Sequence, residues 1–153
     1  MTRRSLRTLA LALLVWGLWG PRAAQAPAPG CVRTDRIVEV GLSTTKYPNV
    51  LAHARRAAAR GWPSVYVLKR RGADARRARL LADIPTRPGY DRDEVPPAIG
   101  RGRGSGLTAG RDPRGWKADV EYVPSGENRG AGAVLGVKLR RFCGGTRFSY
   151  VGY

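Results

Sequence analysis

Two short polar segments carry the residues of this chain that are best suited to chemistry. The first is Tyr90-Asp91-Arg92-Asp93-Glu94, and the second is Glu127-Asn128-Arg129-Gly130-Ala131-Gly132. Acidic residues are scarce, 11 against 28 Lys plus Arg, yet three of the 11 fall within four consecutive positions. Clustered carboxylates repel one another unless a cation lies among them, and hard divalent cations take oxygen ligands of this kind. Because a basic surface around such a site attracts a polyanion, the two segments suggest an enzyme that cuts nucleic acid with a metal.

Phosphodiester cleavage needs an activated water, and it needs charge to be neutralised on the phosphate and the leaving oxygen. A bound ion such as Mg²⁺ supplies the neutralisation, and a positioned base activates the water. Histidine is the usual base, but the one histidine, His53, lies in an Ala/Arg-rich segment far in sequence from both motifs. We interpret His53 as a packed or surface helical residue, which makes Asp93 the better candidate for the base. Asp91 or Glu94 would then be held in structural ion pairs, for instance with Arg92.

The second segment stands where a helix from about Glu127 to Arg141 is expected to begin. Free backbone N–H groups and the helix dipole favour anions such as phosphate at that end. Three glycines, at 130, 132 and 136, weaken the helix by roughly 0.5–1 kcal/mol each, which is easiest to understand where the helix lies close to a strand or a ligand. A Glu-Asn N-cap on a tightly packed helix is the plainer alternative, as a solvated charged turn is for the first segment. The two segments occur at the two ends of a strand–strand–helix unit, and this arrangement favours a shared functional site over the two separate structural explanations.

Hydrophobic periodicity predicts the elements that must position these segments. Helices are expected from Pro48 to Gly61 and from an Asp74 N-cap to Asp83, the second with Arg76 facing outward. Strands are expected at 32–40, 64–68, 118–123 and 146–151. Prolines on both sides place the first segment on a short strand or a rigid loop. Residues 100–115 are expected to form a Gly/Arg loop close to the ligand.

The first 26 residues have the pattern of a secretory signal peptide. Three arginines precede an apolar run from Leu9 to Trp19 that is short for a bilayer span, and Ala24-Gln25-Ala26 offers small residues for cleavage. We therefore expect a secreted protein, without stable membrane insertion after signal cleavage, in which a linker at 27–31 precedes one domain at 32–153. A retained anchor is the alternative. Two cysteines in an exported chain favour one disulfide, between Cys31 and Cys143.

The mature chain is strongly basic. Residues 1–26 contain four basic residues and no acidic one, so their removal lowers the net charge from +17 to +13. This excess is the electrostatic pattern of a nucleic-acid-binding protein. An anionic envelope or membrane surface would satisfy it equally, and so would a high-Arg composition that only keeps a secreted protein soluble.

The motifs resemble those of the NucA/NucB family of secreted bacterial deoxyribonucleases. The matching blocks are Tyr47-Pro48 through His53, Gly72 to Arg77, Ile84 to Glu94, Val120 to Gly132, and Gly145-Thr146-Arg147. The resemblance implies the α+β class and a compact ββα-metal nuclease-like domain, with a small antiparallel sheet packed by helices. It also implies one divalent cation, Mg²⁺ or Mn²⁺. We expect a monomer that acts on DNA, with RNA left open.

The resemblance also assigns roles to individual residues. Asp93 matches the general base, and Glu127 matches the acidic metal ligand, with Asn128 beside it in the metal site. The further catalytic candidates are Arg92, Glu94 and Arg129, and the candidates for DNA contact are Arg87, Arg92, Arg129 and Lys138.

The chain departs from the family pattern in the segment Lys69-Arg70-Arg71, which reads Asp-Arg-Asp in the family, so that two negative charges have become positive. It also departs at Val95, where the family has tryptophan. The first departure motivates an alternative function, a catalytically inactive secreted protein that binds nucleic acid or an anionic envelope on the same scaffold. An unrelated disulfide-bonded structural domain is permitted by composition but is not favoured by the motifs. The sequence therefore favours a secreted, metal-dependent, non-specific DNA endonuclease.

Overall fold

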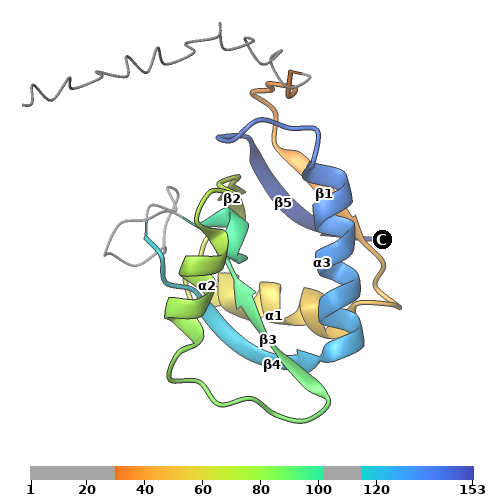
Figure 1. The fold of residues 1–153 in the computed structure, drawn as a ribbon. Helices are drawn as coiled ribbons and strands as arrows, with labels where there is room; N and C mark the ends of the chain where they lie inside the picture. The colour runs from red at the N-terminus through yellow and green to blue at the C-terminus, as the bar shows by residue number, and fades with distance from the viewer. Residues whose placement is uncertain (1–29, 102–114) are drawn as a thin grey trace, which may run out of the picture. The chain divides into compact units, whose positions relative to one another are not determined.

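The structure is a computed structural model and describes residues 30–101 and 115–153. Its elements, in chain order, are β1 (Val38–Leu42), α1 (Pro48–Ala59), β2 (Val65–Val67), α2 (Ala73–Leu81), β3 (Tyr90–Val95), a 3₁₀ turn (Ala98–Gly100), β4 (Asp119–Pro124), α3 (Ser125–Leu139) and β5 (Arg147–Gly152) (Figure 1). The expected signal peptide, most of the linker and most of the Gly/Arg loop lie outside the described residues. No helix in the described ranges is long and apolar enough to cross a membrane.

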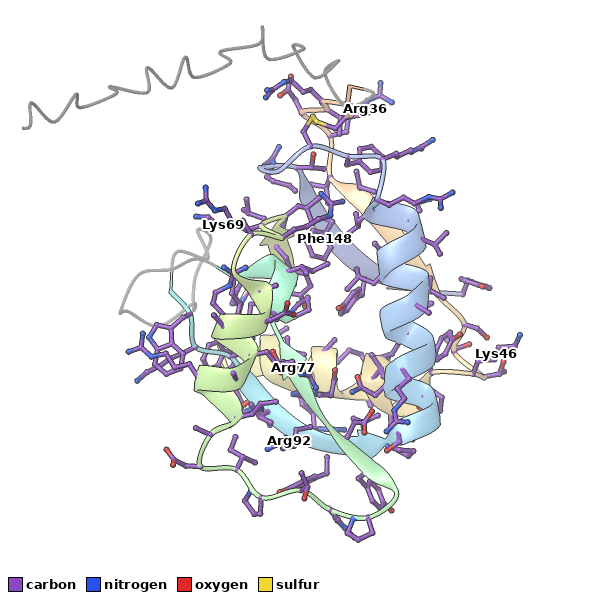
Figure 2. All side chains as sticks on the ribbon, in the orientation of Figure 1. Arg36, Lys46, Lys69, Arg77, Arg92 and Phe148 are labelled. Carbon is purple, nitrogen blue, oxygen red and sulfur yellow. A yellow bond between two sulfur atoms is a disulfide. The ribbon has the colours of Figure 1, made fainter. Side chains whose placement is uncertain are left out.

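Two small sheets and the helices α1 and α3 share one hydrophobic core. One sheet has the strand order β1-β5-β2, with β1 parallel and β2 antiparallel to β5, and β3 and β4 form a separate antiparallel pair. Helices α1 and α3 pack against each other, and each also contacts both sheets. Phe148 of β5, fully buried, lies in the interior (Figure 2). The α+β class is confirmed, although one of the two sheets is mixed rather than antiparallel.

Most predicted elements are present within a few residues of their expected bounds, but the first strand is not. β1 begins at Val38 rather than at Val32, and Val32 makes only an isolated bridge to Phe142. The intervening residues begin Arg33-Thr34-Asp35-Arg36, and the Ile37 that follows is 41% exposed, so this stretch has no apolar face that it buries. An extended backbone here therefore gains nothing from the core.

Helix α2 differs from the prediction in its cap and in the face that it buries. Its N-cap is Gly72, at φ +79°, and Asp74 lies inside the first turn. Arg76 was expected to face outward, but it is buried. Its guanidinium donates hydrogen bonds to the carbonyls of Ala98 at 3.1 Å and Arg71 at 3.0 Å. The outward prediction is wrong because loop carbonyls supply the partners that water would otherwise provide.

The predicted disulfide between Cys31 and Cys143 is present and joins residues 112 positions apart. It links the segment before β1 to the segment between α3 and β5. Backbone hydrogen bonds reinforce the link, from Val32 N to Arg141 O at 2.8 Å and from Cys143 N to Val32 O at 3.0 Å.

The strand–strand–helix unit ends without a loop, because β4 stops at Pro124 and α3 starts at Ser125. A glycine then lets α3 approach the start of α1. A Cβ at Gly130 would lie 2.7 Å from the ring of Tyr47, whereas a Cβ at Gly132 would meet nothing within 4 Å. Gly130 is therefore explained by close helix packing, and Gly132 is not.

This contrast predicts opposite effects of two similar substitutions. Gly130→Ala should lower the free energy of unfolding by about 1–3 kcal/mol, because the methyl group overpacks the contact with Tyr47. Gly132→Ala should raise it by about 0.5–1 kcal/mol, because alanine has the higher helix propensity. Urea denaturation of both variants measures the difference. Equal stability of the two variants would show that α3 does not approach Tyr47 this closely.

Candidate active site

The two-stranded sheet turns an acidic face toward α1. Asp93 pairs with Glu121 across the ladder, and Val95 pairs with Asp119. Since paired residues share a face and successive residues alternate, one face carries four carboxylates. These are Asp91, Asp93, Asp119 and Glu121. Val95 and Val123 lie on the same face and are buried, and α1 packs on both strands, so the acidic face points inward.

Helix α1 meets this face with a polar stripe. The stripe consists of Asn49, His53, Arg56 and Arg60, at intervals that place them on one side of the helix. The Arg56 Nε lies 3.2 Å from each carboxylate oxygen of Glu121, and the Arg60 Nη2 lies 2.7 Å from Oε1 of Glu121. Arg60 also pairs with Asp119. The stripe therefore neutralises much of the charge of the acidic face.

His53 lies between two carboxylates and is fully buried. Its Nδ1 lies 2.6 Å from Oδ2 of Asp93, and its Nε2 lies 3.0 Å from Oδ2 of Asp119. Burial by itself lowers the pKa of His53, but the hydrogen bond and charge of Asp93, with smaller effects of Glu121 and Asp119, raise this pKa above its ordinary value. His53 is packed in a helix, as we interpreted it, but its contact with the candidate base was missed.

A sequence signal for this contact existed in the spacing of polar residues. The stripe of α1 repeats at intervals of four, three and four residues, and the acidic residues of β4 alternate at Asp119 and Glu121. Each pattern alone is typical of a solvated face. Only the packing of α1 on β4 shows that the two patterns face each other.

A cavity of about 430 Å³ lies beside the acidic face, between β3, α2 and α3. Asp91, Asp93 and Glu94 line it from β3, and Asn128 and Arg129 line it from α3. The two segments that the sequence singled out therefore meet at one cavity. Its other lining residues include Asp74, Arg77, Gly132 and Gly136.

Four of these side chains form two ion pairs at the cavity wall. The Nε of Arg129 lies 3.0 Å from Oδ2 of Asp91, and hydrogen bonds from Arg129 and then Ser125 hold the pKa of Asp91 below its ordinary value, against the opposing effect of burial. Arg77 points from α2 toward β3, and its Nη1 lies 2.9 Å from Oε1 of Glu94 (Figure 2). Arg77 was not among the predicted site residues.

Glu94 is more a core residue than a cavity residue. Its carboxylate is almost fully buried and pairs with the buried Arg101 as well as with Arg77. Burial raises the pKa of Glu94, while the charges of Arg101 and Arg77 oppose the rise. A structural ion pair was expected for Asp91 or Glu94, for instance with Arg92, whereas the partners of Glu94 are Arg101 and Arg77.

Glu127 lies at the first turn of α3, where its carboxylate contacts the first turn of α1. Its Oε2 accepts a hydrogen bond from the backbone N of Asn49 at 2.9 Å, and its Oε1 accepts one from Nδ2 of Asn49 at 2.6 Å. Glu127 is not among the described residues that line the cavity. Because Asn49 precedes His53 by one helical turn, Glu127 and Asp93 are both held by the same side of α1.

The remaining predicted residues lie outside the cavity wall. Arg92 donates from Nη1 to the carbonyl of Leu81 at 3.0 Å, which ties β3 to the end of α2 (Figure 2). Arg87 stacks on Tyr90, with its guanidinium carbon 4.3 Å from the ring centre. Lys138 is exposed in the last turn of α3. Their roles in catalysis or DNA binding stay predictions.

One group of described residues could hold a metal ion by the type and proximity of its ligand atoms. His53, Asp119 and Glu121 each offer one such atom, and these atoms lie within 4.8 Å of one another. The same carboxylates already pair with Arg56 and Arg60.

The chain is similar in sequence to a nuclease. It is 36% identical over 102 residues to a DNA-entry nuclease of Bacillus subtilis (strain 168). The chain belongs to the NucA/NucB nuclease family. The match covers 67% of this chain and 62% of the relative. The chain therefore spans less than two thirds of the length of the Bacillus subtilis nuclease. No family model matches the chain.

In this NucA/NucB family member, the pairing of Glu121 with two arginines predicts a pH-dependent stability. The hydrogen bond from Arg56, assisted by Arg60 and opposed by burial, lowers the pKa of Glu121 from 4.5 to about 2. Its contribution is therefore complete above pH 4.5 and is lost as the pH falls toward 2. Glu121→Gln should lower the free energy of unfolding by about 1 kcal/mol at neutral pH, as expected for a partly exposed ion pair.

Urea denaturation across this pH range tests the prediction. The free energies of unfolding of the wild type and the variant should converge as the pH falls. Glu39→Gln, an exposed carboxylate-to-amide change on β1, is the matched control and should show no such dependence. A difference for Glu121→Gln that stays constant with pH would contradict the role of the ionised carboxylate.

Proposed function

We propose that this protein is a secreted, divalent-metal-dependent, non-specific endonuclease that hydrolyses phosphodiester bonds in DNA. The observation that carries the proposal is the cavity at which Asp91 and Asp93 face Asn128 and Arg129. The relative's name, DNA-entry nuclease, supports DNA as the substrate. The disulfide supports export, because disulfides persist in oxidising compartments.

Asp93 is the proposed general base. Its side chain is 12% exposed and lines the cavity, so one carboxylate oxygen can accept a proton from a water molecule there. Arg129 and Arg77 lie on two walls of the same cavity, at 75% and 47% exposure. Both guanidiniums can bind the phosphate of a DNA strand, since bidentate phosphate contacts suit arginine.

The first turn of α3 has the donor chemistry that a divalent cation requires. Each oxygen of Glu127 accepts one hydrogen bond from Asn49 and retains a further lone pair. Asn128 adds an amide oxygen at the cavity wall. Oxygen donors suit Mg²⁺ or Mn²⁺, so Glu127 and Asn128 would hold the ion, with Asn49 fixing the carboxylate. The bound ion would neutralise charge on the phosphate and the leaving oxygen.

The group formed by His53, Asp119 and Glu121 is the weaker metal candidate. Arg56 and Arg60 supply two positive charges to the same two carboxylates. A cation bound there would have to displace these guanidiniums and would meet their repulsion. We therefore place the metal at Glu127 and Asn128.

The altered segment Lys69-Arg70-Arg71 gives little support to an inactive scaffold. Arg70 donates from Nη1 to the carbonyl of Phe142 at 3.1 Å and also contacts the carbonyl of Leu139, at the end of α3. None of the three residues is among the described residues that line the cavity. Arg70 matches the arginine of the family pattern and supports the packing of α3. The two altered residues, Lys69 and Arg71, are exposed and leave the acidic residues of the cavity in place.

A plasmid assay tests the proposed activity. The purified protein should nick supercoiled DNA with Mg²⁺ or Mn²⁺, and EDTA should stop it. Asp93→Asn should reduce kcat about 10²–10⁴-fold, the usual contribution of a general base, while DNA binding is retained. Glu39→Gln should leave cleavage unchanged. An Asp93→Asn variant that cleaves at the wild-type rate would refute the assignment of the base, and binding without cleavage under any divalent ion would favour the inactive alternative.

Calorimetric titration with Mn²⁺ distinguishes the two metal locations without reference to activity. Glu127→Gln should abolish measurable binding, and Asn49→Ala should weaken it about 10–100-fold, as for other residues that orient a ligand. Asp119→Asn should have little effect. The opposite pattern, with binding lost in Asp119→Asn and kept in Glu127→Gln, would move the metal to the His53 group.

A further inference from the structure

His53 is buried out of reach of the substrate, so direct participation in catalysis does not explain why a histidine occupies this position. It has no exposed surface and is not among the described residues that line the cavity. A purely structural role is a weak explanation, because apolar side chains in place of His53 and the two carboxylates that it contacts could extend the apolar side of α1. Well-packed apolar residues often stabilise a protein as much as buried polar pairs do, or more.

The contacts of the imidazole ring fix its orientation from both sides. On one side Nε2 lies 3.0 Å from Asp119, whose carboxylate is also held by Arg60. On the other side Nδ1 lies 2.6 Å from Oδ2 of Asp93. The ring therefore connects a carboxylate anchored in an ion pair to a carboxylate at the cavity.

The effect on Asp93 is to leave its two oxygens in different surroundings. Oδ2 is occupied by His53, and no described residue donates a hydrogen bond to Oδ1. The side chain also lines the cavity, so Oδ1 is the oxygen that remains for a water molecule. A carboxylate without such a tether could rotate about its Cβ–Cγ bond and present either oxygen in many directions.

We propose that His53 is the positioning residue of the general base: its Nδ1–H holds Oδ2 of Asp93, so that Oδ1 faces the cavity. This inference rests on the proposed function, because it assumes that Asp93 accepts a proton there. His53 itself touches neither substrate nor water in this scheme. Its contribution is to orientation, and a displacement of about 1 Å in a catalytic group can cost on the order of 10²-fold in rate.

Two substitutions separate the contact with Asp93 from the contact with Asp119. The amide of His53→Asn can replace Nδ1 as a donor to Asp93, and the longer amide of His53→Gln can replace Nε2 as a donor to Asp119. We expect His53→Gln to lower kcat about 10²-fold at unchanged KM, and His53→Asn to keep most of kcat. Thermal unfolding of both variants shows how much protein is folded in each assay.

A second measurement follows the hydrogen bond without activity. His53 is the one histidine of the chain, so the imidazole nitrogen resonances of a ¹⁵N-labelled, untagged protein are unambiguous. The Nδ1 resonance should report a bound proton and should shift in Asp93→Asn, whereas Glu39→Gln should leave it unchanged.

The outcomes distinguish the inference from the proposed function. A wild type that cleaves no DNA under any divalent ion would overturn the proposed function, whatever the nitrogen resonances report. A cleaving wild type with unchanged kcat in His53→Gln would overturn the role of His53 alone. Equal losses in His53→Asn and His53→Gln that follow the folded fraction would also overturn it, because they would indicate a structural residue.

Discussion

The pairing of an acidic strand face with a polar helix stripe is the interaction on which the rest of the site depends. Carboxylates taken out of water cost several kcal/mol each unless they are paired and hydrogen-bonded. The carboxylates of Asp93, Asp119 and Glu121 face α1, which supplies one imidazole and two guanidiniums to meet them. This charge matching fixes how α1 lies on the two strands. Through the hydrogen bonds between Asn49 and Glu127, it also fixes where α3 begins.

An apolar interface at this place would be the simpler way to stabilise the fold. The chain instead keeps a polar network where Asp93 lines the cavity, and it builds an ordinary core elsewhere, around Phe148 and Leu139. Buried polar groups in place of an apolar interface are expected at functional sites. The buried pair of Glu94 and Arg101 is a second case. Glu94 lies directly beside Asp93 in sequence, so both cases involve a carboxylate of β3.

Local patterns in the sequence were sufficient to predict the helices and strands. They were not sufficient to predict which side chains of distant segments contact one another. The helical spacing around Leu51 and the alternation around Tyr122 gave α1 and β4 nearly to the residue. The outward prediction for Arg76 was wrong and the contacts of His53 were missed for a shared reason. The burial of a polar side chain depends on donors and acceptors from distant segments, such as the Ala98 carbonyl or the Asp119 carboxylate, and spacing along one segment carries no information about them. The two motifs were found because their acidic residues are unusual in so basic a chain.

Two of the glycines of α3 are better explained by the cavity that the helix lines than by the stability of the helix. Gly130 is needed where Tyr47 approaches, but Gly132 and Gly136 have open space beside them and line the cavity. A side chain at either position would occupy volume that a nucleic acid backbone could fill. Leu135 and Leu139, on the buried side, hold the helix in place despite its low intrinsic propensity. The acidic residues of β3 thus face a helix wall in which Gly132 and Gly136 leave open space, and this agrees with the proposed binding of a phosphodiester strand.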